Sequence, residues 1–320
     1  MKRSLNVAAA IAVGLSLITA TTAAGAEKVT VAFVGADLVD PYYKTMHCGA
    51  SAAAKKFNVN LTWQGINGVD FAPEVTAFNA VVQKKPAAIV LVPFSSTAFM
   101  QPVKAAQAGG IPVVTADAAL AKPIEFGNVR TDNLVLGGLA ADSMNTSLKG
   151  KGKVAVVSFA ADVPVQADRV NGFKKRIAAK YPGLKVVSVE YGGADAGKSA
   201  QKVAALIQRF PDLGGVFATD TNDAEGAGSA ILAAGKRGKI KLVAYDASPK
   251  EVQGLKTGLF DALVAQAPYD AGYGAIKLAA SAARGGAKPK VFWQHTGGAV
   301  ITKANVGSAK VKTFLYRETC

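Results

Sequence analysis

Short apolar runs alternate with alanine-rich segments of helical period, and this alternation limits the possible folds more than any other feature of the sequence. Runs such as AAIVLVP and KVAVVSF are apolar at successive positions, which is typical of strands covered on both faces within a parallel sheet. Because strand and helix follow each other in strict alternation, the sequence predicts βαβ units with right-handed crossovers, and therefore an α/β fold.

The alternation is too long for a single sheet. The expected strands span 29–35, 59–63, 87–93, 111–116, 153–159, 184–191, 214–219, 240–245 and 260–266. The expected helices lie near 43–57, 74–84, 97–109, 132–147, 165–180, 197–210, 222–234, 249–257 and 269–284. So many units predict two doubly wound, Rossmann-like domains with parallel sheets. The stretch 126–132 follows four strand–helix units and is the expected crossing between the domains.

The amino terminus has the pattern of a secretory signal. Residues 1–3 are basic (MKR), residues 7–20 are almost entirely apolar, and residues 24–26 (AGA) have the small-x-small form of a signal-peptidase site. The apolar stretch is shorter than the roughly 20 residues that a membrane-spanning helix needs. We therefore interpret residues 1–26 as a signal peptide cleaved after Ala26, with a membrane anchor as the alternative. No cysteine follows that site, so we expect an exported protein without a lipid anchor, located in the periplasm.

Composition excludes several other classes. Half of the residues are hydrophobic and only 18% are charged, which excludes a disordered chain. Two cysteines cannot staple 320 residues into a disulfide scaffold. The formal net charge of +15 raises the possibility of nucleic-acid binding, but the lysines are scattered in pairs and form no basic run interleaved with aromatics. We interpret the charge as a solvated basic surface and expect no nucleic-acid partner.

Polar residues stand just after the predicted strands, at the edge where open α/β sheets bind ligands. Four of these positions carry the aspartates Asp40, Asp117, Asp220 and Asp246. Arg169 and Gln266 lie at the same edge. An aspartate after a strand is also a good helix N-cap, and capping is the alternative for any one of them. The recurrence at one topological position favours a ligand site.

The ordered set of segments resembles the sugar-binding proteins of bacterial ABC importers, the ribose-binding type of the type I periplasmic binding protein family. The opening VTVAFVGADLVDPYYKTMHCGA has the Asp-Pro-aromatic-aromatic turn of that family. Further matches follow in the same order over residues 28–305: AAIVLVP, AGGIPVVTAD, TDNLVLGGLAA, RVNGF, GGVFATD, KLVAYD and ALVAQAPYDAGYGA. The resemblance implies two lobes joined by a three-segment hinge, with the ligand in the cleft between them. The lobes comprise 27–131 plus 267–294, and 132–266 plus 295–320.

The resemblance also implies the ligand and its contacts. The implied contacts are Asp40, Tyr42, Tyr43, Asp117, Arg169, Asp220, Asp246 and Gln266. Carboxylates accept hydrogen bonds from sugar hydroxyls, a guanidinium donates them, and tyrosine rings offer flat faces to a sugar ring. For the two tyrosines, core packing is the alternative. The implied protein is a monomer without cofactor or metal that delivers a sugar or polyol to an ABC permease in the inner membrane.

Three positions depart from the ribose-binding pattern. Ala118 stands where an arginine is usual, Pro93 where a polar residue is frequent, and Ala194 near the place of a stacking aromatic. A larger or differently oriented sugar, a polyol, and a non-sugar signal molecule such as a furanosyl compound therefore stay open.

Two rival functions have some support in the sequence. Residues 192–199, GGADAGKS, match the phosphate-binding pattern G-x-x-x-x-G-K-S between a predicted strand and helix, but export to a compartment without ATP argues against nucleotide binding. Paired carboxylates leave an exported carbohydrate-processing enzyme as the runner-up. His47 and His295 have no metal-ligand spacing to a cysteine or to each other, so we expect no catalytic or metal residues.

The two cysteines, Cys48 and Cys320, both follow the signal and would enter an oxidising compartment. We expect a disulfide between them that ties the end of the sequence to the first helix, with two free thiols as the alternative.

Overall fold

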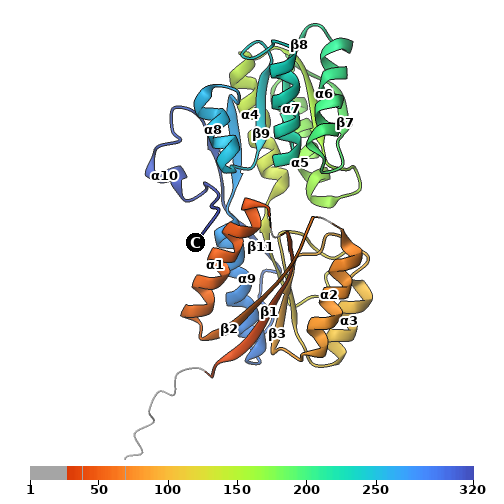
Figure 1. The fold of residues 1–320 in the computed structure, drawn as a ribbon, viewed down its shortest axis with the longest axis vertical. Helices are drawn as coiled ribbons and strands as arrows, with labels where there is room; N and C mark the ends of the chain where they lie inside the picture. Colours follow the sequence, from red (N-terminus) through yellow and green to blue (C-terminus); the bar gives the residue numbers. More distant parts are fainter. Residues whose placement is uncertain (1–26, 38, 69) are drawn as a thin grey trace, which may run out of the picture.

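Two six-stranded sheets, one in each of two lobes, organise the computed structural model, which describes residues 27–37, 39–68 and 70–320 (Figure 1). The first sheet has the order β2 (Val59–Ile66), β1 (Val29–Asp37), β3 (Ala88–Leu91), β4 (Val113–Ala116), β5 (Asn128–Thr131), β11 (Trp293–Thr296). The second has the order β7 (Leu184–Tyr191), β6 (Gly152–Ser158), β8 (Leu213–Ala218), β9 (Lys241–Tyr245), β10 (Ala262–Gln266), β12 (Gly298–Ile301). The two sheets thus repeat one topology, and the expected two-domain α/β fold is confirmed.

Helices cover both faces of each sheet. In the first lobe they are α1 (Pro41–Lys56), α2 (Phe71–Gln83), α3 (Met100–Ala108) and α9 (Pro268–Ala283). In the second they are α4 (Asn133–Leu148), α5 (Pro164–Lys180), α6 (Ala196–Arg209), α7 (Thr221–Ala233) and α8 (Pro249–Thr257). A short helix, α10 (Ala309–Lys312), follows β12.

The apolar runs explain why each sheet is covered twice. Successive side chains of a strand point to opposite faces. In β1, Val31 and Phe33 pack in the same core cluster as α1 and α9, whereas Ala32 and Val34 pack with α2 and α3. Strand β6 divides in the same way between α6 and α7 on one face and α4 and α5 on the other. A strand buried on both faces needs apolar residues at every position, as the sequence has.

Glycines allow the closest helix pairs to meet. A side chain at Gly49 of α1 would strike the backbone carbonyl of Tyr269, and one at Gly272 of α9 would strike the carbonyl of Met46. Because neither glycine has a Cβ, α1 and α9 pack backbone to backbone. This contact fixes α1, which carries Tyr42 and Tyr43, against the start of α9.

Several expected elements need correction. Strands β5, β11 and β12 and helix α10 were not predicted. The segments NVRT and WQHT are short and polar, GAVI is apolar but has only four residues, and α10 is a single turn. The expected strands at 87–93 and 111–116 are shorter, since β3 and β4 each have only four residues. The sheets are mostly parallel, as expected, and the second lobe departs from this at its edge, where β12 pairs with β10 in antiparallel fashion.

The chain passes between the sheets at three places. These lie between β5 and α4 (residue 132), between β10 and α9 (residue 267), and between β11 and β12 (residue 297). Strand β11 pairs with β5 as far as Thr296, two residues past the expected lobe boundary at 294.

None of the described helices is long and apolar enough to span a bilayer.

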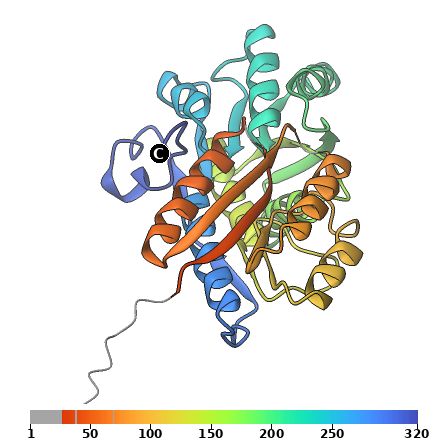
Figure 2. The same cartoon turned by 60° about the horizontal axis from the view of Figure 1, so that its bottom comes forward.

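The segment after α10, residues 313–320, connects the lobes once more (Figure 2). The backbone N–H of Tyr316 donates to the carbonyl of Ala247 in the second lobe, 3.1 Å away. The next residue, Arg317, donates its N–H to Thr45 Oγ1 on α1 of the first lobe at 2.7 Å. The predicted disulfide between Cys48 and Cys320 is confirmed and fixes the end of this segment to α1.

Candidate ligand-binding site

Polar side chains from the carboxyl ends of both sheets come together where the lobes meet. Asp40 precedes α1 and Asp117 follows β4 in the first lobe, whereas Asp220 and Asp246 follow β8 and β9 in the second. The charge of Asp246 acts on Asp40 across the junction. The charges of Asp117 and of Asp246 likewise act on Arg169. The predicted positions therefore lie in one electrostatic neighbourhood.

In the first lobe, two tyrosines of α1 hold Asp117. The hydroxyl of Tyr42 donates to Oδ1 at 2.8 Å and that of Tyr43 donates to Oδ2 at 3.1 Å. The two rings lie edge to face with centroids 5.0 Å apart. Burial, followed by the charge of Asp117, raises the pKa of both tyrosines well above the usual value. Both hydroxyls therefore stay protonated and act as donors.

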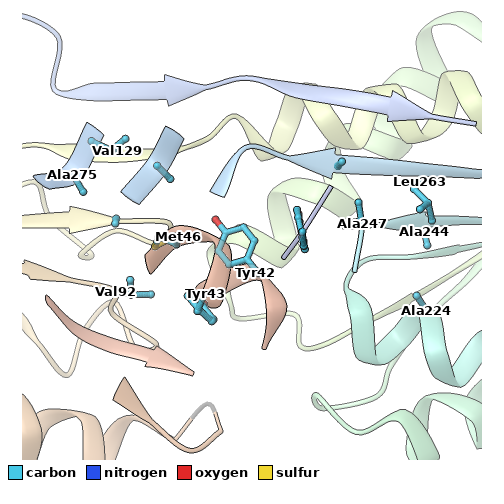
Figure 3. Packing of buried hydrophobic residues seen from close by; sticks show 14 of the residues in the cluster. Tyr42, Tyr43, Met46, Val92, Val129, Ala224, Ala244, Ala247, Leu263 and Ala275 are labelled. Carbon is cyan, nitrogen blue, oxygen red and sulfur yellow. The ribbon is translucent and has the colours of Figure 1, made fainter. Parts of the chain in front are cut away.

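Figure 3 shows where the tyrosines lie. Tyr42 and Tyr43 stand between core residues of the first lobe (Met46, Val92, Val129, Ala275) and core residues of the second (Ala224, Ala244, Ala247, Leu263). Both side chains are buried, with exposures of 5% and 8%. They occupy the junction of the lobes and not the interior of one lobe alone.

Asp40 caps helix α1 as well as facing the site. Its carboxylate accepts from the N–H of Tyr42 at 2.8 Å, so the capping role considered from the sequence is present. Burial raises the pKa of Asp40 to about 7, although the cap hydrogen bond opposes the rise. Asp246 and Asp220 raise it further, because they are like charges.

In the second lobe, Arg169 on α5 is held rigidly. Its Nε donates to Asn133 Oδ1 and its Nη1 donates to the carbonyl of Thr219, both at 2.8 Å. The guanidinium lies 4.0 Å from the centroid of the Tyr245 ring. Burial disfavours its charge, but Tyr245 and nearby carboxylates raise its pKa overall, so it stays a cation. Because two nitrogens of this buried guanidinium are fixed, its remaining N–H groups point in a defined direction.

Asp246 is held by side chains from two other segments. Gln266 Nε2, at the end of β10, and Tyr316 Oη each donate to Asp246 Oδ1 at 2.7 Å. Burial raises the pKa of Asp246, while Arg169, Gln266 and Tyr316 oppose the rise. The other atom of the Gln266 amide, Oε1, is buried and has no hydrogen-bond partner among the described residues. A buried acceptor without a partner is costly and indicates a group that a ligand can satisfy.

Asp220 takes part in a polar network beside the site. It caps α7 through the N–H of Asp223 at 2.9 Å and accepts from Gln166 Nε2 at 3.0 Å. Asp223 lies behind it, fully buried, and receives the hydroxyl of Ser199 at 2.7 Å. Burial, then the charge of Asp220, raises the pKa of Asp223 to about 9. Asp223 is therefore neutral near pH 7.

The structure brings all eight predicted site residues to the junction and adds others that the sequence did not indicate. The additions are Asn133, Gln166, Tyr245 and Tyr316. Gln166 lies in the first turn of α5, a few residues past a predicted strand, whereas Asn133 follows β5, a strand that the sequence did not indicate. Tyr316 lies beyond every predicted element and had no comparable signal.

The glycine-rich segment 192–199 forms the turn from β7 into α6. Its Ser199, which would bind magnesium in a phosphate-binding loop, is fully buried and bonded to Asp223. The segment therefore serves the packing of α6 against α7. The described residues also contain no group of three or more side chains suited to hold a metal ion.

Two lobes of this topology with polar side chains at their junction define the class of two-lobed binding proteins. A family model described as "periplasmic binding protein domain" matches residues 31–287, and the chain belongs to this family. Its members are binding proteins and not enzymes, which confirms the prediction of a non-enzymatic function.

Individual relatives agree with this assignment. The chain is 26% identical to a ribose import binding protein of Salmonella typhimurium, over 89% of this chain and 94% of the relative. It is 27% identical to a xylitol-binding protein of Mycolicibacterium smegmatis, where the match spans 66% of this chain and 60% of the relative.

Solved structures give the same picture. An ABC transporter solute binding protein from Agrobacterium vitis, bound with α-D-tagatopyranose, is 33% identical with a TM-score of 0.86, covering 91% of this chain and 100% of that one. A carbohydrate transporter solute binding protein from Agrobacterium radiobacter, in complex with D-arabinose, is 30% identical with a TM-score of 0.84, covering 90% and 99%.

Proposed function

We propose that this protein captures a sugar or polyol between its two lobes and delivers it to an ABC permease of the inner membrane. The observation that carries the proposal is the concentration of buried hydrogen-bonding side chains from both lobes at one place. A polyhydroxylated ligand can both donate to carboxylates and accept from a guanidinium, and each of its ring faces can pack against an aromatic ring. Relatives that bind tagatose, arabinose, ribose and xylitol support this ligand class.

The proposed contacts divide between the lobes. On the first-lobe side, Tyr42 and Tyr43 offer ring faces and Asp117 accepts ligand hydroxyls. On the second-lobe side, Arg169 donates and Asp246 accepts. Asp40 and Asp220 add acceptors at the edge of the site, and Gln266 Oε1 gains the hydrogen bond that it lacks.

Ligand binding would close the lobes on each other. A ligand that contacts both lobes binds the closed form better than an open one, and this difference shifts the population toward closure. The proposed lobes, 27–131 with 267–294 and 132–266 with 295–320, would turn about the passages at residues 132, 267 and 297, with 295 and 296 moving with the first lobe because β11 pairs with β5. The closed surface would then be the form that the permease recognises.

The proposal includes the cellular setting. Residues 1–26 lie outside the described part of the structure, and we propose that they are removed after Ala26 during export to the periplasm. The mature protein would act as a monomer and needs no cofactor, because the ligand is carried and not changed.

A thermal-shift screen followed by calorimetry tests the function. The mature protein is screened against D-tagatose, D-arabinose, D-fucose, D-allose, D-ribose and xylitol. A ligand at about 100 times its dissociation constant adds about 2.7 kcal/mol to stability, which is a clear shift in melting temperature. Calorimetry should give one site per chain, and the sugar should be recovered unchanged. Hydrolysis of a chromogenic glycoside would instead support the enzyme alternative, and no shift with any compound would overturn the sugar proposal.

A further inference from the structure

The C-terminal segment, residues 313–320, reaches the ligand site from outside both sheets. Tyr316 is 5% exposed, and its ring lies edge to face against Tyr42 with centroids 5.7 Å apart. Its hydroxyl donates to Asp246 Oδ1 at 2.7 Å and accepts from the backbone N–H of Gln266 at 3.3 Å. One side chain thus contacts the first-lobe tyrosine, the second-lobe carboxylate and the strand that enters the hinge.

The residues after Tyr316 are fastened to one face of α1. Thr45 accepts from the N–H of Arg317 at 2.7 Å, and Lys44 forms an ion pair with Glu318 at 2.6 Å. The disulfide between Cys48 and Cys320 is the third contact of these residues with α1. Lys44, Thr45 and Cys48 stand at helical spacing, so they share one side of α1. The disulfide is the one covalent contact among these three, and without it the residues after Tyr316 would rely on partly exposed contacts.

We propose that Tyr316 is a positioning residue of the ligand site and that the Cys48–Cys320 disulfide keeps it there. The hydroxyl of Tyr316, together with Gln266 Nε2, fixes Oδ1 of Asp246 and so holds the carboxylate in the orientation in which it meets a ligand hydroxyl. The segment is also a fourth link between the lobes, closed covalently in an oxidising compartment and open after reduction. This inference rests on the proposed function in so far as Asp246 and Gln266 are ligand contacts.

A readout without ligand tests the positioning role. The pKa of the Asp246 carboxyl is measured by carbon NMR in the wild type, in Tyr316→Phe and in Tyr181→Phe. Tyr181 is the matched control, since its hydroxyl donates to Asp142 at 2.7 Å away from the site. The Tyr316 hydrogen bond lowers the pKa of Asp246, so Tyr316→Phe should raise it and Tyr181→Phe should not. The other charged or titratable groups around Asp246 are unchanged in both variants: Asp40, Tyr42, Arg169, Asp220, Tyr245 and Glu251.

Hydrogen exchange without ligand tests the tether. In the double variant Cys48→Ser/Cys320→Ser, the amides of Arg317 and Gln266 should exchange faster than in the oxidised wild type. Those of α6 (Ala196–Arg209), which lies in the other half of the second lobe, should keep their rates and show that the variant is folded. Unchanged exchange at both Arg317 and Gln266 would overturn the tether.

Sugar binding then links the segment to function. The probe is whichever of D-tagatose, D-arabinose, D-fucose and D-allose binds the wild type most tightly. Tyr316→Phe should weaken its binding about tenfold, as for one hydrogen bond to a charged group, and Tyr181→Phe less than twofold. An unchanged Asp246 pKa together with unchanged affinity in Tyr316→Phe overturns the positioning role and leaves sugar binding intact. A wild type that binds none of these four sugars, D-ribose or xylitol contradicts the proposed ligand class, while the two ligand-free measurements still decide the role of the segment.

Discussion

Asp117 and Asp246 occupy the same place in the two lobes, but they are held in different ways. Each follows the fourth strand of its sheet order, β4 or β9, and each has a positive φ, +62° and +82°. Aspartate tolerates this left-handed conformation better than most residues, so the same turn aims both carboxylates toward the junction.

The two carboxylates differ in how many segments of the chain supply their partners. Asp117 receives two hydroxyls from adjacent residues of a single helix, Tyr42 and Tyr43. Asp246 receives its donors from β10 and from the C-terminal segment, at Gln266 and Tyr316. Both halves of the site are therefore tertiary constructions, but the first uses one helix as its donor, whereas the second needs two separate segments to meet at one carboxylate oxygen.

The largest effect should come from removing the cation of the second lobe. Arg169→Ala deletes the buried donor and leaves Asn133 Oδ1 and the Thr219 carbonyl without the hydrogen bonds that it gives them. Sugar affinity measured by calorimetry should fall about 100-fold, roughly 3 kcal/mol. Arg176→Ala is the control, because Arg176 lies on the same helix but pairs with Asp142. Equal affinities of the two variants would mean that the second lobe does not contribute its charge to binding.

The direct comparison of the lobes is Asp246→Asn against Asp117→Asn. Asparagine keeps the left-handed backbone and removes the negative charge. Asp246 is the stronger carboxylate partner of Arg169, so its variant should lose about 30-fold in sugar affinity and the Asp117 variant about tenfold. Calorimetry on both variants shows which of them loses more sugar affinity. A larger loss for Asp117→Asn would reverse the assignment of charge recognition to the second lobe.

Smaller effects should follow from the tyrosine hydroxyls of the first lobe. Tyr42→Phe removes the 2.8 Å hydrogen bond to Asp117, and Tyr43→Phe removes the 3.1 Å one. Each ring face remains, so sugar affinity should fall about fivefold for Tyr42→Phe and less for Tyr43→Phe. If either variant lost as much as Arg169→Ala, the hydroxyls would have to contact the ligand directly instead of orienting Asp117.

The smallest expected effect concerns Asp40 and pH. Its pKa is about 7 in the folded protein and 3.8 as the ordinary value, so the folded state binds more protons between these limits. Stability from this group is therefore full below about pH 4 and is lost as pH rises through about 7. Asp40→Asn keeps a helix cap and removes this loss. Urea unfolding at pH 5 and pH 8 should show the variant gaining stability on the wild type at the higher pH. A gain equal at both values would contradict the raised pKa.

The sequence predicted the parts of the fold that depend on local pattern. Apolar runs located nine strands, because a strand buried on both faces must be apolar throughout. The same rule missed β11, which is polar (WQHT), and β12, whose apolar run GAVI has only four residues; both pair only after the chain returns to each sheet. Their direction depends on where the chain crosses between lobes, and periodicity carries no information about that.

The residues of the candidate site likewise divide into those that a local pattern indicated and those that it did not. Asp40, Asp117, Asp220 and Asp246 were found because each lies within three residues of the end of a strand. Tyr316 lies 70 residues from Asp246 in sequence, and only the disulfide prediction indicated that its segment returns to the first lobe. Its pairing with Asp246 is a tertiary contact without a local signal.

The central claim is that both lobes hold one ligand, and small-angle scattering tests it most directly. The mature protein is measured alone and at saturation with the sugar that binds most tightly in the screen. A radius of gyration that decreases on binding is the predicted result, because the ligand favours the closed form. The decrease should be absent in Arg169→Ala at the same sugar concentration. A radius that stays constant at saturation, with binding verified by calorimetry, would contradict closure and would favour a site carried by one lobe.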